Sequence, residues 1–213
     1  MKKKLYLAGG MFAAFILWTV IVCTVDVKPI GPNGSAVGLA AFNQWMQQCI
    51  GTHLTWYYLT DLFSLIPLGI IAGFALLGLL QWVKRRKLCK VDRSILALGG
   101  FYILTMAAYL LFEVIAVNYR PVLIEGVLEA SYPSSTTVLV ICVMATAMLQ
   151  FSARIKQRVI KCGVLTTCAV FTVFMVLGRV VSGVHWITDI IGGILLSASL
   201  ILLYAALCEG KSK

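Results

Sequence analysis

Six long apolar runs dominate the 213-residue sequence and limit what it can fold into. They cover residues about 5–25, 57–83, 94–117, 134–151, 163–181 and 186–207. A helix of roughly 20 apolar residues crosses the hydrocarbon core of a bilayer and satisfies its own backbone hydrogen bonds there. Only 12% of the residues are charged, about half the share found in soluble domains. The sequence therefore predicts an all-α integral membrane protein, a bundle of six transmembrane helices.

The first apolar run follows three lysines and has to be distinguished from a cleaved signal peptide. It is longer than the apolar part of a typical signal peptide, and no small-residue cleavage site follows it. We expect this run to be retained as the first transmembrane helix.

Lysine and arginine are distributed unevenly between the two sides of the predicted bundle. Fifteen of the 18 fall on one side: Lys2, Lys3, Lys4, Lys84, Arg85, Arg86, Lys87, Lys90, Arg93, Arg154, Lys156, Arg158, Lys161, Lys211 and Lys213. Only Lys28, Arg120 and Arg179 fall on the other. Because cytoplasmic loops collect Lys and Arg, both termini are predicted to be cytoplasmic, in a multi-pass protein of the cell membrane. Topology then explains the net charge of +10, and no nucleic-acid partner is expected.

The longest outer segment, residues 26–56, admits two interpretations. It opens with KPIGPNGS, a stretch of Pro, Gly and Asn that is typical of turns. Apolar residues then recur at helical spacing among Asn and Gln, namely Val37, Ala41, Phe42, Trp45 and Met46. This pattern favours a short helix lying in the membrane interface. A plain connecting loop is the other interpretation.

The seven cysteines do not indicate a site. On this topology only Cys49 lies in an outer segment, so it has no partner there for a disulfide. No pair of cysteines has the spacing of metal ligands. We expect the cysteines to be packing residues, and we expect no metal site and no cofactor.

The other two outer segments carry residues that suit an anion. Residues 118–133 contain Arg120, and residues 181–186 contain His185, with Arg179 at the end of the preceding helix. Arginines near the membrane, on the side that usually lacks basic residues, are candidates for function. Their planar guanidinium groups match the geometry of phosphate oxygens.

A histidine and an aspartate stand close together in the stretch GRVVSGVHWITD. His185 and Asp189 are four residues apart at the predicted start of the last helix, where they would share a face. Asp189 could accept a hydrogen bond from one imidazole nitrogen and leave the other free as a nucleophile or base. By itself such a pair is more often structural than catalytic.

The stretch YPSSTT supplies a further group of candidates. Ser134, Ser135 and Thr136 follow Pro133 at the predicted start of the fourth helix. Hydroxyls and free backbone N–H groups at a helix N-terminus form a natural anion site. With the two arginines and the His–Asp pair, they are the parts required for phosphoryl transfer to a histidine.

These three segments resemble the signature of the type 2 phosphatidic acid phosphatase (lipid phosphate phosphatase) superfamily. That signature reads K-x6-R-P, then P-S-G-H, then S-R-x5-H-x3-D. The matching residues are Arg120-Pro121, Pro133-Ser134, and Arg179, His185 and Asp189. The resemblance covers nearly the whole chain and implies one membrane-embedded phosphatase-like domain over residues 1–213.

The resemblance implies a role for each matching residue. His185 would form a phosphohistidine, and Asp189 would orient it. Arg120, Arg179 and Ser134 would hold the phosphate of a membrane lipid. No metal takes part in this chemistry.

The first and third motifs each depart from the pattern at one position. Glu113 stands seven residues before Arg120, where the family has lysine, and Gly178 replaces the serine before Arg179. Glu113 could pair with an arginine, contact a cationic group of the ligand, or lie outside the site. Lys28 could supply the missing positive charge.

The second motif departs at its last two positions, Ser135 and Thr136. Thr136 replaces the histidine that protonates the leaving group in the family. A positioned general acid contributes about 10²–10⁴-fold to such a reaction, and threonine is a poor proton donor. A lipid diphosphate releases a phosphate monoester, which leaves readily without that proton. The hypothesis is therefore a preference for lipid diphosphates, such as a polyprenyl diphosphate, over phosphatidic acid.

Two further hypotheses follow from the same residues. The chain could bind a lipid phosphate without hydrolysing it, as a sensor, transporter or partner subunit. A channel or carrier unrelated to this family has less support, because Asp61, Glu113 and Asp189 lie near outer helix ends. His53 could replace the lost acid if residues 26–56 fold over the site. The identity of the lipid and the oligomeric state are left open.

Restoring the missing histidine should change substrate choice. The Thr136→His variant is expected to hydrolyse phosphomonoesters such as phosphatidic acid faster than the wild-type protein, because an imidazolium can protonate an alkoxide leaving group. Phosphate release from phosphatidic acid and from a polyprenyl diphosphate measures this. An unchanged ratio of the two rates would contradict the assignment of Thr136 to the leaving-group side.

Overall fold

The computed structural model describes residues 2–209 as a helical bundle. Two of the predicted basic residues, Lys211 and Lys213, lie outside this range. The helices are α1 (Lys2–Thr24), α2 (Ala40–Ile50), α3 (Leu54–Phe63), α4 (Leu65–Arg85), α5 (Arg93–Val114), α6 (Ser135–Arg154), α7 (Arg158–Ser182) and α8 (Ile187–Glu209), with short 3₁₀ turns η1 (Pro32–Gly34) and η2 (Leu88–Lys90). Within the described residues, β-structure is limited to three isolated bridges. The predicted all-α class is confirmed.

Six spans in the described chain are long and apolar enough to cross a membrane, as the sequence predicts. The second span, Leu54–Arg85, consists of two helices, α3 and α4, that meet at Ser64. Pro67 explains the division, because proline has no N–H to donate to the carbonyl four residues earlier and its ring clashes with that carbonyl.

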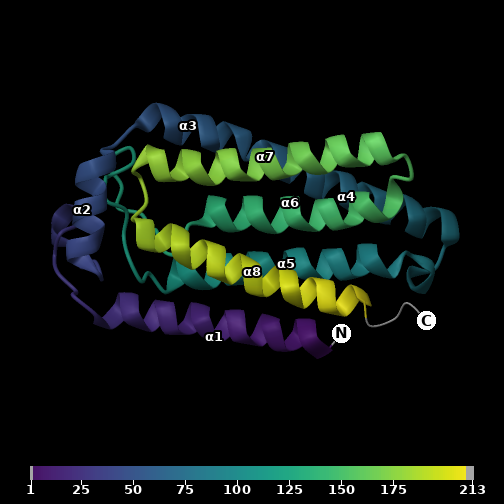
Figure 1. Ribbon diagram of the computed structural model, residues 1–213, viewed down its shortest axis with the longest axis horizontal. Helices are drawn as coiled ribbons and strands as arrows, with labels where there is room; N and C mark the ends of the chain where they lie inside the picture. The colour runs from purple at the N-terminus through teal and green to yellow at the C-terminus, as the bar shows by residue number, and fades with distance from the viewer. Residues whose placement is uncertain (1, 210–213) are drawn as a thin grey trace.

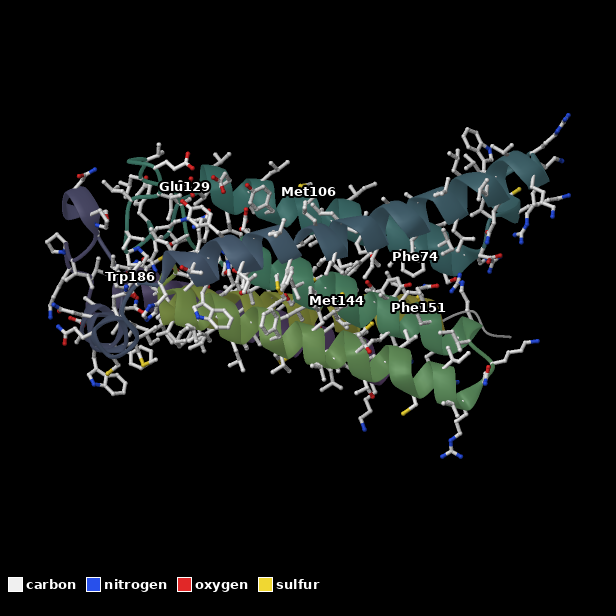
Figure 2. All side chains as sticks on the ribbon, turned by 90° about the horizontal axis from the view of Figure 1, so that it is seen from above. Phe74, Met106, Glu129, Met144, Phe151 and Trp186 are labelled. Carbon is white, nitrogen blue, oxygen red and sulfur yellow. The ribbon has the colours of Figure 1, made fainter. Side chains whose placement is uncertain are left out.

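The start of α1 and the end of α8 lie at the same end of the bundle, and α2 lies across the opposite end (Figure 1). Between the ends, α6 and α8 are the most buried spans. Phe74 of α4 and Phe151 of α6 pack with ring centroids 5.6 Å apart in the half of the bundle away from α2 (Figure 2). Trp186 and Glu129 lie at the α2 end in the same view.

The first helix packs along α8 and holds the segment that precedes α6. Phe15 and Val22 of α1 are buried in the main apolar core. The Phe15 ring stacks on Tyr132 with a centroid distance of 6.3 Å, and the Tyr132 hydroxyl lies 2.7 Å from Thr19 Oγ1. Gly192 permits the approach of α8, since a Cβ there would lie 2.6 Å from the Tyr132 ring.

Residues 26–56 contain the helix α2, and its polar face turns toward the protein. The amide of buried Asn43 donates to Gly38 O and to Thr188 Oγ1, at 2.8 and 3.0 Å. Gln47 Nε2 donates to Gly183 O at 3.0 Å. Trp45 is exposed on the other side of the helix. The segment is thus bonded to the connection between α7 and α8.

Glycine is required at the point where these two segments meet. Gly183 has φ +61°, and a Cβ at this position would lie 1.9 Å from Gly51 O. The neighbouring backbone continues the contact, because His53 N donates to Ser182 O at 2.9 Å.

Substituting Gly183 should therefore destabilise the fold by more than the strain of its positive φ angle alone. Gly126 is a matched control, since it has φ +81° but open space around its Cβ position. Gly126→Ala is expected to lower the free energy of unfolding by about 1–2 kcal/mol, because alanine is strained in the left-handed conformation. Gly183→Ala should lower it by this amount and by the further cost of displacing Gly51. Unfolding midpoints in detergent compare the two. Equal losses would contradict the close packing of residues 26–56 on the α7–α8 connection.

Candidate active site

His185 lies in the turn between α7 and α8, at the α2 end of the bundle. We expected it on the last helix, but α8 begins two residues later, at Ile187. The residue is only 4% exposed, and neither ring nitrogen has a hydrogen-bond partner. A buried imidazole with two unpartnered nitrogens is available to react with a ligand.

Asp189 faces His185 from the first turn of α8. Its Oδ2 is 3.9 Å from His185 Nδ1, longer than the hydrogen bond expected from the sequence. Both carboxylate oxygens are engaged by other donors: Trp186 N donates to Oδ2 and Asn118 Nδ2 to Oδ1, each at 3.0 Å. The first of these bonds is the backward half of a capping box. Asp189 therefore fixes the start of α8 and turns Oδ2 toward Nδ1, so Nε2 is the ring nitrogen that does not face the carboxyl group.

Arg179 comes from the last turn of α7 and is 1% exposed. Its Nη1 donates to Thr60 Oγ1 of α3 at 3.2 Å, while its Nε has no partner. The preceding residue, Gly178, allows this contact, because a Cβ there would lie 2.6 Å from Thr60 Cγ2. The glycine at the family's serine position thus permits α3 to bring a threonine hydroxyl to Arg179.

Arg120 reaches the same region from the connection between α5 and α6 and is 8% exposed. Its Nε lies 3.0 Å from Glu129 Oε2 without hydrogen-bond alignment, and Nε and Nη1 have no hydrogen-bond partner. Backbone bonds shape this connection: Arg120 N donates to Glu129 O at 3.0 Å, and Trp186 Nε1 donates to Tyr119 O at 2.7 Å. The last bond ties it to the turn that carries His185.

The two arginines act on the charge state of the histidine. Burial lowers the pKa of His185 well below its ordinary value of 6.5, and the positive charges of Arg179 and Arg120 lower it further. The imidazole is therefore neutral at pH 7, the form in which a histidine can act as a nucleophile. Buried guanidinium N–H groups without partners are costly, and an anion placed among them would satisfy them.

The start of α6 closes another side of the site. Ser134 occupies the predicted N-cap position of α6, but its side chain does not cap the helix. Its Oγ accepts from Thr137 Oγ1 at 3.0 Å, and its backbone N donates to Asp189 O at 3.0 Å. The unfilled cap leaves helix N-terminal N–H groups available to an anion.

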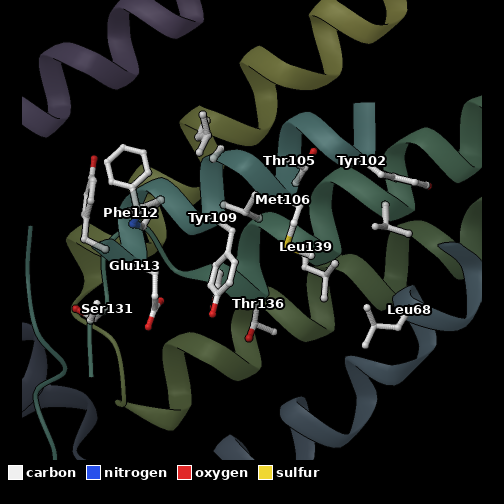
Figure 3. Close-up of a pocket in the computed structure, with 18 of the residues that line it drawn as sticks. Leu68, Tyr102, Thr105, Met106, Tyr109, Phe112, Glu113, Ser131, Thr136 and Leu139 are labelled. Carbon is white, nitrogen blue, oxygen red and sulfur yellow. The ribbon is translucent and has the colours of Figure 1, made fainter. Parts of the chain in front are cut away.

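A cavity of about 390 Å³ opens beside this site between α4, α5 and α6. Most of its wall is apolar, including Leu68, Phe112 and Leu139. Glu113 and Ser131 lie on one side of the close-up view, and Tyr102 and Thr105 lie on the other (Figure 3). Such a cavity, mostly apolar with a few polar groups, has the size and composition of a small-molecule site.

The structure divides the predicted site residues into three groups. Arg120, Arg179, His185 and Asp189 lie together, with Ser134 bonded to the main chain of Asp189. Ser135, Thr136 and Glu113 line the cavity instead. Lys28 and His53 lie outside both, since Lys28 is exposed 2.8 Å from Asp26 Oδ1, and the exposed His53 ring contacts Ile50 O at 3.0 Å.

Several site residues were not identified from the sequence. They are Asn118, Ser131, Tyr57 and Thr60. Asn118 is buried and holds Asp189, and Ser131 lies beside both His185 and Asp189. Asn118 stands two residues before Arg120, but an asparagine in a polar loop carries no signal of its own. Within residues 2–209, no three His, Cys, Asp or Glu side chains are grouped as metal ligands would be.

Comparison with known proteins identifies the family. The model of the PAP2 superfamily matches residues 54–212, so the chain belongs to this superfamily, as the resemblance indicated. No curated protein sequence matches the chain. Among solved structures, the chain is similar to the crystal structure of a transmembrane PAP2-type phosphatidylglycerolphosphate phosphatase from Bacillus subtilis. The identity is 17%, the match covers 98% of both chains, and the TM-score is 0.64.

The titration of His185 tests the electrostatics of this site. In a His53→Gln variant, which leaves one histidine, the imidazole NMR signals of His185 should show a neutral ring at pH 6.5 and change only at lower pH. Because the folded state resists this proton and the unfolded chain accepts it near pH 6.5, acid below that pH should also destabilise the fold.

The Arg120→Gln substitution, made in the same variant, should raise the pKa of His185, since it removes one of the two charges that lower it. Arg154→Gln, at the far end of α6, serves as a charge-matched control and should leave the titration unchanged. A His185 pKa at or above 6.5, or no response to Arg120→Gln, would contradict the predicted charge state.

Proposed function

We propose that this protein is a membrane phosphatase that removes phosphate from lipids through a phosphohistidine on His185. The observation that carries the proposal is the group of buried N–H donors around a buried, neutral histidine. Arg120 and Arg179 together present three nitrogens without hydrogen-bond partners beside that ring. Guanidinium forks of this kind match the oxygens of phosphate as well as those of a carboxylate.

The reaction follows from the positions of these groups. His185 Nε2 attacks phosphorus, and the P–N bond forms as the P–O bond to the leaving group breaks. The arginines and the start of α6 stabilise the charge on the phosphoryl oxygens, while Asp189 stabilises the positive charge that develops on the ring. Water then attacks the phosphohistidine, the P–N bond breaks, and inorganic phosphate leaves.

The preferred substrate is proposed to be a lipid diphosphate, such as a polyprenyl diphosphate, rather than phosphatidic acid. Thr136 and Glu113 line the cavity wall beside the site. Because they are a threonine and a glutamate, they supply neither an imidazolium nor an ammonium group there. A lipid monophosphate released from a diphosphate needs no strong proton donor, whereas an alkoxide does. The apolar part of the cavity is suited to the hydrocarbon chain of the substrate.

The site is proposed to face the outside of the cell membrane. The start of α1, the end of α8 and the basic connections, such as residues 84–93, lie at the end of the bundle opposite α2 (Figure 1). Segments rich in Lys and Arg remain cytoplasmic, and this rule supports an outer position for the α2 end and His185.

Binding without hydrolysis is the second candidate function. It is favoured by the engagement of both Asp189 oxygens with other donors and by the 3.9 Å separation of Oδ2 from His185 Nδ1. A site of this kind would hold a lipid phosphate headgroup without activating the histidine.

One experiment separates the two candidates. Purified protein is incubated with polyprenyl diphosphate and phosphatidic acid labelled in the terminal phosphate, and both released phosphate and acid-labile protein-bound phosphate are measured. Hydrolysis is expected to be faster for the diphosphate and to be reduced by several orders of magnitude in His185→Ala. The His53→Ala variant, which removes the exposed histidine, should match the wild-type protein.

Each adverse result has a defined meaning in this assay. Faster turnover of phosphatidic acid would contradict the substrate preference. Saturable binding of both lipids with no phosphate release and no labelled protein would contradict the phosphatase proposal and support binding without hydrolysis.

A further inference from the structure

The ring of Tyr57 contacts both phosphate-site arginines. The guanidinium carbon of Arg179 lies 4.9 Å from the ring centroid, and that of Arg120 lies 5.4 Å from it. Tyr57 is half-buried on α3, far from both arginines in the sequence. One aromatic ring is therefore shared by two cations that come from different segments.

This contact solves a problem that the two arginines create. Two buried positive charges near each other repel, and a site that binds an anion needs both of them in place. A carboxylate between them would neutralise the charges, but it would also occupy the N–H groups that a phosphate has to reach. An aromatic face attracts a cation through its quadrupole and takes none of its hydrogen-bond donors.

The hydrogen bonds of the arginines agree with this division of roles. Arg179 uses Nη1 for Thr60 and keeps Nε without a partner. Arg120 has Glu129 Oε2 3.0 Å from Nε without hydrogen-bond alignment, and its Nη1 has no partner. Thr60 lies on α3, like Tyr57, and its hydroxyl also donates to Trp56 O and Tyr57 O. The short helix α3 thus holds the arginines by one ring and one hydroxyl.

We infer that Tyr57 is a positioning residue that fixes Arg120 and Arg179 for the terminal phosphate of the lipid through its aromatic face. The inference rests on the proposed function. It assigns a role in phosphate binding to α3, which carries none of the three sequence motifs of the site. The phenolic hydroxyl is not required for this role.

The inference is tested with Tyr57→Phe, which keeps the aromatic face, and with Tyr57→Leu and Tyr57→Met, which remove it. The inhibition constant of orthovanadate and the KM for a lipid diphosphate are measured for each purified variant. Both should rise about tenfold or more in the Leu and Met variants, which corresponds to the loss of cation–π contacts by a desolvated cation. The Phe variant should stay within about twofold of the wild-type protein.

Tyr58→Leu is the matched control. Tyr58 is the next residue of the same helix, is 53% exposed, and packs against the edge of Tyr57 rather than on an arginine. This variant should keep wild-type vanadate inhibition. Thermal unfolding midpoints of all variants distinguish a loss of anion binding from a loss of fold, and two non-aromatic replacements guard against one that does not fold.

The outcomes separate this inference from the proposed function. Wild-type affinity for vanadate in a folded Leu or Met variant would overturn the role of Tyr57 and leave the phosphatase intact. A Phe variant as weak as the Leu variant would overturn it too, because the hydroxyl would then be the important group. A wild-type protein that neither hydrolyses lipid phosphates nor responds to vanadate would overturn the proposed function, and the inference with it.

Discussion

The burial of two guanidinium groups at one end of a membrane bundle is the constraint on which the rest of this site depends. Removing a cation from water costs several kcal/mol unless other groups replace the lost hydration. Arg179 has one hydroxyl and the face of a tyrosine, and Arg120 has the same face and a carboxylate that is poorly aligned with it. An anion bound between the two arginines would supply hydrogen-bond acceptors for the remaining donors.

The rigidity of the surrounding frame makes this arrangement possible. Asp189 is held by the main chain of Trp186 and the amide of Asn118, and its own carbonyl accepts from Ser134. These bonds join α8, the connection after α5, and the start of α6 at one point. Because three elements share the aspartate, the histidine turn cannot shift without disturbing all of them. The site is built to hold its geometry before any substrate binds.

Much of the fold and a large part of the site could be predicted from the sequence. The length of the apolar runs indicated six spans, because only a helix satisfies its backbone within lipid. The spacing of Arg179, His185 and Asp189 indicated the central group, since these residues are close in the chain. The break at Ser64 was missed, although Pro67 signals it.

The contributions of Tyr57, Thr60 and Asn118 could not be predicted. Each acts on a residue at least 60 positions away, and each belongs to a type that is common in any membrane helix or loop. The positions of Thr136 and Glu113 in the cavity wall could not be predicted either, because that wall comes from several helices. Contacts of this kind depend on how the helices pack, which no local pattern records.

The first 53 residues of the chain lie outside the matched family segment, yet they are integral to its architecture. Thr19 supports the tyrosine before α6, Trp18 Nε1 donates to Thr188 O, and Asn43 bonds the same threonine. The matched segment is therefore not self-contained, because side chains from residues 2–53 brace it. A chimera with a different N-terminal part would inherit the reactive residues without these braces. A substitution in the N-terminal part could then change the geometry of the site while every residue of its signature stays the same.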